Sequence, residues 1–199
     1  MRIILASTSP YRRKLMSRLR LPFEAVAPDT DESLLNGEAA RDRACRLARL
    51  KAESVAANTA SESTVIIGSD QVASLGDTIL RKPGTPERAI DQLLKCSGAT
   101  VQFWTAVSVF WPHGYQQRVI PCAVTFRALS ETEAAHYVEI DDPLACAGSF
   151  KWESLGISLF QKLETQDPTS LEGLPLIALC ALLREAGVDL PLAAQPLEH

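Results

Sequence analysis

The sequence lacks several features that mark common classes of protein. It has no basic excess, because its formal net charge is −4 and its isoelectric point is near 5.4. This argues against non-specific binding of nucleic acid polymers or membrane surfaces. The most apolar stretch, residues 174–183, is about half as long as the roughly 20 residues that span a bilayer. No P-loop, HExxH motif or nucleophile elbow is present, so any site must be built from scattered residues.

Paired cysteines are also missing. The five cysteines are odd in number, lie far apart and form no CxxC motif, which favours free thiols in a reducing cytosol over disulfides or zinc. No N-terminal signal is visible, because Ser7 interrupts the short apolar run after Arg2. We therefore expect a cytoplasmic protein with no membrane attachment. The final residues 197–199, LEH, resemble the remainder of an expression tag.

What is present is an ordinary globular composition. The 199 residues are 46% hydrophobic and 22% charged, which is enough for one sizeable core. Nothing marks a linker, a repeat or a low-complexity segment. We expect a single domain over residues 1–194, followed by a tail at 195–199.

Apolar periodicity and capping residues predict alternating strands and helices. Buried strands are expected at 2–6 and 64–68, and a hairpin at 99–111 and 116–128. Helices are expected after Ser9-Pro10 and after Thr85-Pro86, where each pair reads as N-cap and first residue. Further helices are expected at 38–57, from the capping box at 130–133 toward 141, and at 170–186. The fold class is α/β, with a central mixed sheet flanked by helices.

The stretch LASTSPYRR, residues 5–13, is the first candidate for a functional site. Its hydroxyl residues, among them Ser7 and Ser9, and the adjacent Arg12 and Arg13 gather at a predicted helix N-terminus, which attracts anions. The alternative is that both arginines are solvated surface charges. The hydroxyl residues before the arginines strengthen the phosphate interpretation, and taken alone the segment leaves both interpretations open.

Three further charged residues are candidates, each with a plainer alternative. Asp70 follows the apolar run 64–68 and serves as a general base, a metal ligand or a simple turn former. Lys82 either reaches a phosphate chain or is solvated, and Glu32 is either a ligand or one of a run of surface acids.

Taken in order, the motifs LASTSPYRR, DE at 31–32, RLARLKA at 46–52, GSDQV at 68–72, KPGTPERA at 82–89 and CAGSFKWESLGI at 146–157 cover nearly the whole chain. Together they resemble the Maf family of nucleoside triphosphate pyrophosphatases. Gln71 after the aspartate, and the form of the later loop, are similar to the branch associated with 7-methyl-GTP rather than the branch associated with dTTP and UTP.

The resemblance implies two lobes with a nucleotide-binding cleft and an oligomeric state of homodimer. It implies cleavage of the α–β phosphoanhydride with a divalent cation, and Asp70 as the proton acceptor that activates water. It also ties Tyr11, Gln71, Lys151 and Glu153 to substrate choice. We expect Asp70 on the floor of the cleft and the cationic groups on its rim, namely Arg12, Arg13, Lys51 and Lys82.

Physical chemistry makes these roles plausible. The four cations and the hydroxyls of Ser7 and Ser9 would offset the negative charge of a triphosphate, and Glu32 with Asp70 would hold Mg²⁺ or Mn²⁺. The 7-methylated purine is itself cationic. Stacking on Tyr11 and a carboxylate from Glu153 would favour it over guanine, and Gln71 would supply both a donor and an acceptor.

The sequence departs from the family pattern at two places. Arg81 precedes Lys82 where glycine is common, and Trp152 with Ser154-Leu155 stands where smaller residues are expected, which affects the placement of Glu153. Two alternatives stay open. One is a pyrophosphatase for another nucleotide such as ITP, XTP, dTTP or UTP. The other is a non-catalytic nucleotide sensor that regulates septum formation.

Overall fold

The computed structural model describes residues 1–59 and 63–196, and the suggested tag at 197–199 lies outside this range. The chain divides into two compact units. The first comprises residues 1–71, 105–120 and 167–199, and the second comprises 72–104 and 121–166. No helix in the described ranges is both long enough and apolar enough to cross a membrane.

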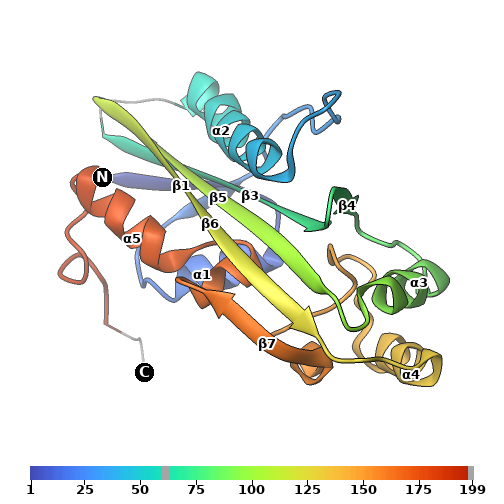
Figure 1. Ribbon diagram of the computed structural model, residues 1–199. Coiled ribbons are helices and arrows are strands. Elements are labelled where there is room, and N and C mark those ends of the chain that lie inside the picture. Colours follow the sequence, from blue (N-terminus) through green and yellow to red (C-terminus); the bar gives the residue numbers. More distant parts are fainter. Residues whose placement is uncertain (60–62, 197–199) are drawn as a thin grey trace. The chain divides into compact units, whose positions relative to one another are not determined.

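The strands form one mixed sheet, which confirms the α/β expectation (Figure 1). Its order is β2-β1-β3-β5-β6-β7, with β4 paired to β3. β1 is parallel to both β2 and β3, whereas β3 with β4 and β6 with β7 are antiparallel. The strands are β1 (Arg2–Ala6), β2 (Glu24–Val26), β3 (Thr64–Leu75), β4 (Thr78–Leu80), β5 (Thr100–Trp111), β6 (Gly114–Phe126) and β7 (Phe160–Thr165).

The helices begin largely where the capping residues predict. Ser9 and Thr85 cap α1 (Pro10–Ser17) and α3 (Pro86–Cys96), and each helix has proline in its first turn. Ser130 and Glu133 form the predicted capping box of α4 (Glu131–Asp141). α2 (Ala40–Thr59) starts two residues later than expected. The remaining helices are the 3₁₀ segments η1 (Leu155–Leu159) and η2 (Pro168–Glu172), and α5 (Leu176–Glu185).

Within the first unit, the two faces of β1 and β3 bury alternate side chains. Ile4, Ala6 and Ile66 pack against Ala52 and Val55 of α2. The intervening residues face the opposite way and pack against α1 and α5, a core that includes Leu5, Ile67, Leu15, Met16 and Leu179. Burial on both faces explains why these strands read as continuous apolar runs rather than as alternating ones.

The second unit has its own aromatic core. Phe150 meets Phe103, Phe126 and Phe160 edge to face, with ring centroids 4.8 to 5.5 Å apart. Such geometry places the positive edge of one ring against the negative face of another. α3 packs against α4 beside this core.

Two elements differ from the prediction by more than two residues. The strand expected at 64–68 runs to Leu75, because its second half pairs with β4 after its partner β1 has ended opposite Gly68. The final helix is not continuous from 170 to 186. Gly173 adopts φ +99°, a left-handed conformation that ends η2, and Pro175 then precedes a separate α5.

Candidate functional site

The serine hydroxyl oxygens at the start of α1 accept hydrogen bonds from the backbone. Ser9 Oγ accepts a hydrogen bond from the backbone N–H of Arg12 at 3.4 Å, and Ser7 Oγ accepts one from the N–H of Ser9 at 3.1 Å. Because a hydroxyl also carries a proton, each serine keeps one donor for a further partner. The predicted N-cap is therefore confirmed.

Arg12 is drawn inward from the first turn of α1. Its Nε donates to the carbonyl oxygen of Gly173 at 2.8 Å, and its Nη2 lies 3.9 Å from Asp70 Oδ1. Burial lowers the pKa of this guanidinium, and the nearby Asp70 and Glu32 oppose that effect. Arg13, the next residue, is exposed, as expected for neighbours about 100° apart around a helix.

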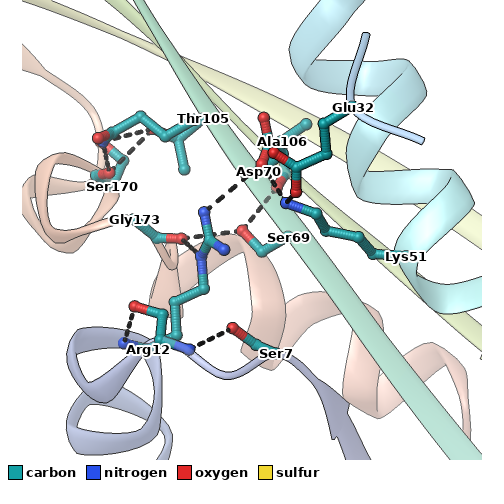
Figure 2. A network of polar contacts seen from close by, with 12 residues as sticks. Ser7, Arg12, Glu32, Lys51, Ser69, Asp70, Thr105, Ala106, Ser170 and Gly173 are labelled. Carbon is teal, nitrogen blue, oxygen red and sulfur yellow. Dashed lines mark hydrogen bonds and ion pairs between the residues drawn. The ribbon is translucent and has the colours of Figure 1, made fainter. Parts of the chain in front are cut away.

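Asp70 lies at the centre of a compact charge cluster (Figure 2). Its Oδ1 receives a hydrogen bond from Lys51 Nζ at 2.6 Å, and the same Nζ lies 2.7 Å from Glu32 Oε1. The side chains of Lys51 and Asp70 are only 8% and 10% exposed, whereas that of Glu32 is 56% exposed. Lys51 thus differs from the expected rim position, because it is buried between two carboxylates.

The backbone fixes the pairing of Lys51 with Asp70. Lys51 comes from α2 and Asp70 from β3, and these elements pack closely together at Gly68. A Cβ at position 68 would stand 2.2 Å from the carbonyl oxygen of Ala48, so no other residue fits without moving the helix. Asp70 lies within β3 but beyond the end of β1, which pairs no further than Gly68. The carboxylate is therefore held at the edge of the parallel part of the sheet.

A second set of polar contacts joins β3 and β5 to η2. Ser69 Oγ is 2.8 Å from the carbonyl oxygen of Ala106 and 2.9 Å from that of Gly173, which also accepts from Arg12. Thr105 Oγ1 donates to the carbonyl oxygen of Ser170 at 2.9 Å. Figure 2 shows these groups beside the charge cluster. Sequence reasoning assigned no role to Thr105, Ser170 or Gly173.

Gln71 is bound to the same turn. Its Nε2 donates to the carbonyl oxygens of Ser170 at 2.8 Å and Leu171 at 3.1 Å, and contacts Thr105 Oγ1 at 3.1 Å. Its amide donors are therefore committed within the protein. The signal for this turn was present in the sequence as Asp167-Pro168 followed by Gly173, a short helix start and stop, but the apolar run after it hid the break.

The remaining predicted residues are placed as follows. Tyr11 is half-buried in the first turn of α1. Lys82, Lys151 and Glu153 belong to the second unit. Lys82 is exposed after β4, Lys151 is bound by its backbone N–H to the hydroxyl of Tyr137, and Glu153 is exposed.

Two carboxylates of the charge cluster are candidate ligands for a divalent cation. Asp70 and Glu32 both contact Lys51 Nζ, so their carboxylate oxygens lie close together. Carboxylate oxygens are ligands that Mg²⁺ and Mn²⁺ favour. No group of three or more histidine, cysteine, aspartate or glutamate side chains is arranged to hold a metal in residues 1–59 and 63–196. The residues thus fit a cation that takes its other ligands from water or from a bound phosphate.

Comparison with known proteins identifies relatives of this chain. A 7-methyl-GTP pyrophosphatase of Pseudomonas aeruginosa is 50% identical over 191 residues, covering 95% of this chain and 98% of that protein. One of Xanthomonas oryzae pv. oryzae is 50% identical over 190 residues, covering 96% and 99%. Among solved structures, the Staphylococcus aureus Ham1 protein aligns loosely, with a TM-score of 0.43 and 18% identity over 64% of this chain and 71% of that chain. The family model described as Maf-like protein matches residues 2–186, and the chain therefore belongs to the Maf family.

Proposed function

We propose that this protein hydrolyses 7-methyl-GTP to 7-methyl-GMP and pyrophosphate. The observation that carries the proposal is that the chain is 50% identical, over nearly its full length and theirs, to relatives named 7-methyl-GTP pyrophosphatase. The buried cluster of Arg12, Lys51 and Asp70 supports it, because cations stabilise the negative charge of the phosphoryl groups and a carboxylate can accept a proton from water.

The charges of the cluster are balanced before substrate binds. Arg12 and Lys51 bring two positive charges, and Asp70 and Glu32 bring two negative ones. A triphosphate adds several negative charges, so it needs further positive charge in the bound state. Arg13, which is exposed and follows Arg12 directly, is the cation that we assign to this task, and the phosphate contact of Lys82 that the family resemblance implies stays a prediction.

Asp70 is the residue that we assign to proton transfer. Both of its ionic contacts, from Lys51 and from Arg12, fall on Oδ1. Oδ2 is therefore the oxygen assigned to accept a proton from the attacking water. Arg12 has Nη1 and Nη2 in addition to its bonded Nε, and their N–H groups match the fork geometry of a phosphate.

Asp70 and Glu32 would hold the divalent cation. When bound, such an ion polarises phosphoryl oxygens and neutralises developing charge. Without a cation, Lys51 holds the two carboxylates together, since both lie within 2.7 Å of its Nζ.

The five cysteines are free, which supports a reducing compartment such as the cytoplasm. The homodimer implied by family resemblance stays a prediction.

The experiment that tests the proposal is pyrophosphate release with Mg²⁺ or Mn²⁺, measured for wild type and Asp70→Asn. The panel contains 7-methyl-GTP, GTP, dTTP, UTP and ITP. We expect 7-methyl-GTP to have the highest kcat/KM, and Asp70→Asn to lower kcat by roughly 100-fold or more, because asparagine keeps the shape but cannot accept the proton.

The other outcomes are equally informative. Turnover centred on another nucleotide would keep the enzyme class and reject the substrate. Nucleotide binding with no turnover on any of the five would reject catalysis in favour of a sensor. Near-normal activity in Asp70→Asn would reject the role of that residue. Asp77→Asn, which alters an exposed aspartate in the turn between β3 and β4, is the matched control.

A further inference from the structure

Gln71 directly follows Asp70, the candidate general base. The hydrogen bonds of its side chain are made within the protein, mostly to the backbone, which argues against a direct contact with the nucleobase. Its side-chain amide donates to two successive carbonyl oxygens of η2, those of Ser170 and Leu171. Thr105, which is fully buried, donates to the Ser170 carbonyl as well. The two side chains therefore bind the same turn of backbone, from β3 and from β5.

The turn they bind ends at the carbonyl that holds Arg12. The Gly173 N–H donates back to the Ser170 carbonyl at 2.9 Å, closing η2. The Gly173 carbonyl then accepts from Arg12 Nε at 2.8 Å. A guanidinium is planar, so fixing Nε also fixes the plane in which both Nη groups present their N–H donors. The position of η2 thus sets the direction of the Arg12 fork.

We propose that Gln71 and Thr105 are positioning residues for Arg12, acting through η2, and that they set affinity for the polyphosphate chain rather than choice of base. This rests on the proposed function insofar as Arg12 binds the phosphates of the substrate. Removing either donor would take away part of the hydrogen bonding that ties η2 to β3 and β5, and would leave the turn freer to shift. The Arg12 fork would then lose its alignment while the base contacts stay as they were.

The test uses inorganic tripolyphosphate with Mg²⁺ as the probe, with binding measured by calorimetry. Thr105→Val removes the hydroxyl at nearly constant shape, and Thr105→Ser restores it, so the two form a matched pair. We expect about tenfold weaker binding for Thr105→Val and for Gln71→Met, and a change below about twofold for Thr105→Ser. In a double-mutant cycle with Arg12→Lys, Thr105→Val should add less than about twofold, because the coupling runs through the arginine.

Nucleotide kinetics supply the second readout. For 7-methyl-GTP and GTP alike, Thr105→Val and Gln71→Met should raise KM, and the ratio of their kcat/KM values should stay within about twofold of wild type. A shift in that ratio with unchanged tripolyphosphate binding would overturn the proposal in favour of base contact by Gln71. Additive losses in the cycle, or equal losses in Thr105→Val and Thr105→Ser, would also overturn it.

The two proposals fail separately. Tripolyphosphate binding needs no turnover, so a wild type that hydrolyses none of the nucleotides yet shows the expected cycle would overturn only the substrate. A wild type that turns over 7-methyl-GTP but shows additive losses would overturn only the positioning role. If Thr105→Val does not fold, Gln71→Met takes its place in the cycle, since Gln71 is half-buried and binds the same carbonyl.

Discussion

Glu153 is an exposed carboxylate held between two anchored residues of the second unit. The Tyr137 hydroxyl accepts from the Lys151 N–H at 2.9 Å and donates to Asp141 Oδ2 at 2.8 Å, and Ser154 Oγ donates to Asp141 Oδ1 at 2.6 Å. Burial is the main cause that raises the pKa of Tyr137, so its hydroxyl stays protonated and able to donate. Residues 152–154 form a turn before η1, and Ser154 is tied to α4 through Asp141.

Replacing Glu153 by alanine tests its predicted part in base choice. A cationic 7-methylguanine gains from a nearby carboxylate and neutral guanine does not, so Glu153→Ala should lower the ratio of kcat/KM for 7-methyl-GTP over GTP about tenfold. The measurement is pyrophosphate release from each nucleotide, with Glu139→Ala as an exposed control. An unchanged ratio would remove Glu153 from the specificity model.

At the scale of elements, the start of α4 carries a titratable cap. Glu133 accepts from the Ser130 N–H at 2.9 Å and from its hydroxyl at 2.8 Å, and it pairs with Arg127 at 2.7 Å. These contacts, the backbone hydrogen bond first, lower the pKa of Glu133 from 4.5 to about 2. Because the folded pKa is depressed, the stabilisation is present above about pH 4.5 and is lost as the pH falls toward 2.

Glu133→Gln keeps the cap but removes its charge. The difference in free energy of unfolding between wild type and Glu133→Gln should be positive near neutral pH and should shrink between pH 4.5 and 2. Urea unfolding over this pH range measures it, with Glu131→Gln as the control for one charge lost from the same helical turn. A difference that stays constant with pH would contradict the assignment.

Elements with local signals were predictable from the sequence, and those set by partners were not. Ser9-Pro10, Thr85-Pro86 and the capping box at Ser130 carry their information within four residues, and all three helices start there. The length of β3 depends on β4, and the position of Lys51 depends on how α2 meets the strand. The local sequence pattern predicts neither the full length of β3 nor the burial of Lys51, because both depend on tertiary contacts.

At the scale of the whole molecule, the free cysteines report on unfolding. Burial raises the pKa of both the Cys96 and Cys122 thiols to about 11, and both residues are fully buried. The thiolate is the reactive form, so these two should resist a thiol reagent such as dithiobis(nitrobenzoic acid) at about pH 8. All five cysteines should react in denaturant.

Peptide mapping after timed labelling identifies which cysteines react. The labelling rate of Cys96 and Cys122 should rise with urea in parallel with the loss of secondary structure, because only global opening exposes them. Rapid labelling of either residue in native buffer would show that its surroundings open locally. Cys45, which is half-buried, serves as the internal comparison.

The contact at Gly68 has a consequence for anyone diversifying this gene. Since any side chain there would meet the Ala48 backbone, a substitution would push α2 away and carry Lys51 with it. In a mutagenesis library screened for new substrates, codon 68 would score as intolerant because of its packing against α2. A library that keeps glycine at position 68 and varies positions in the nucleotide site would contain a larger share of variants that still fold.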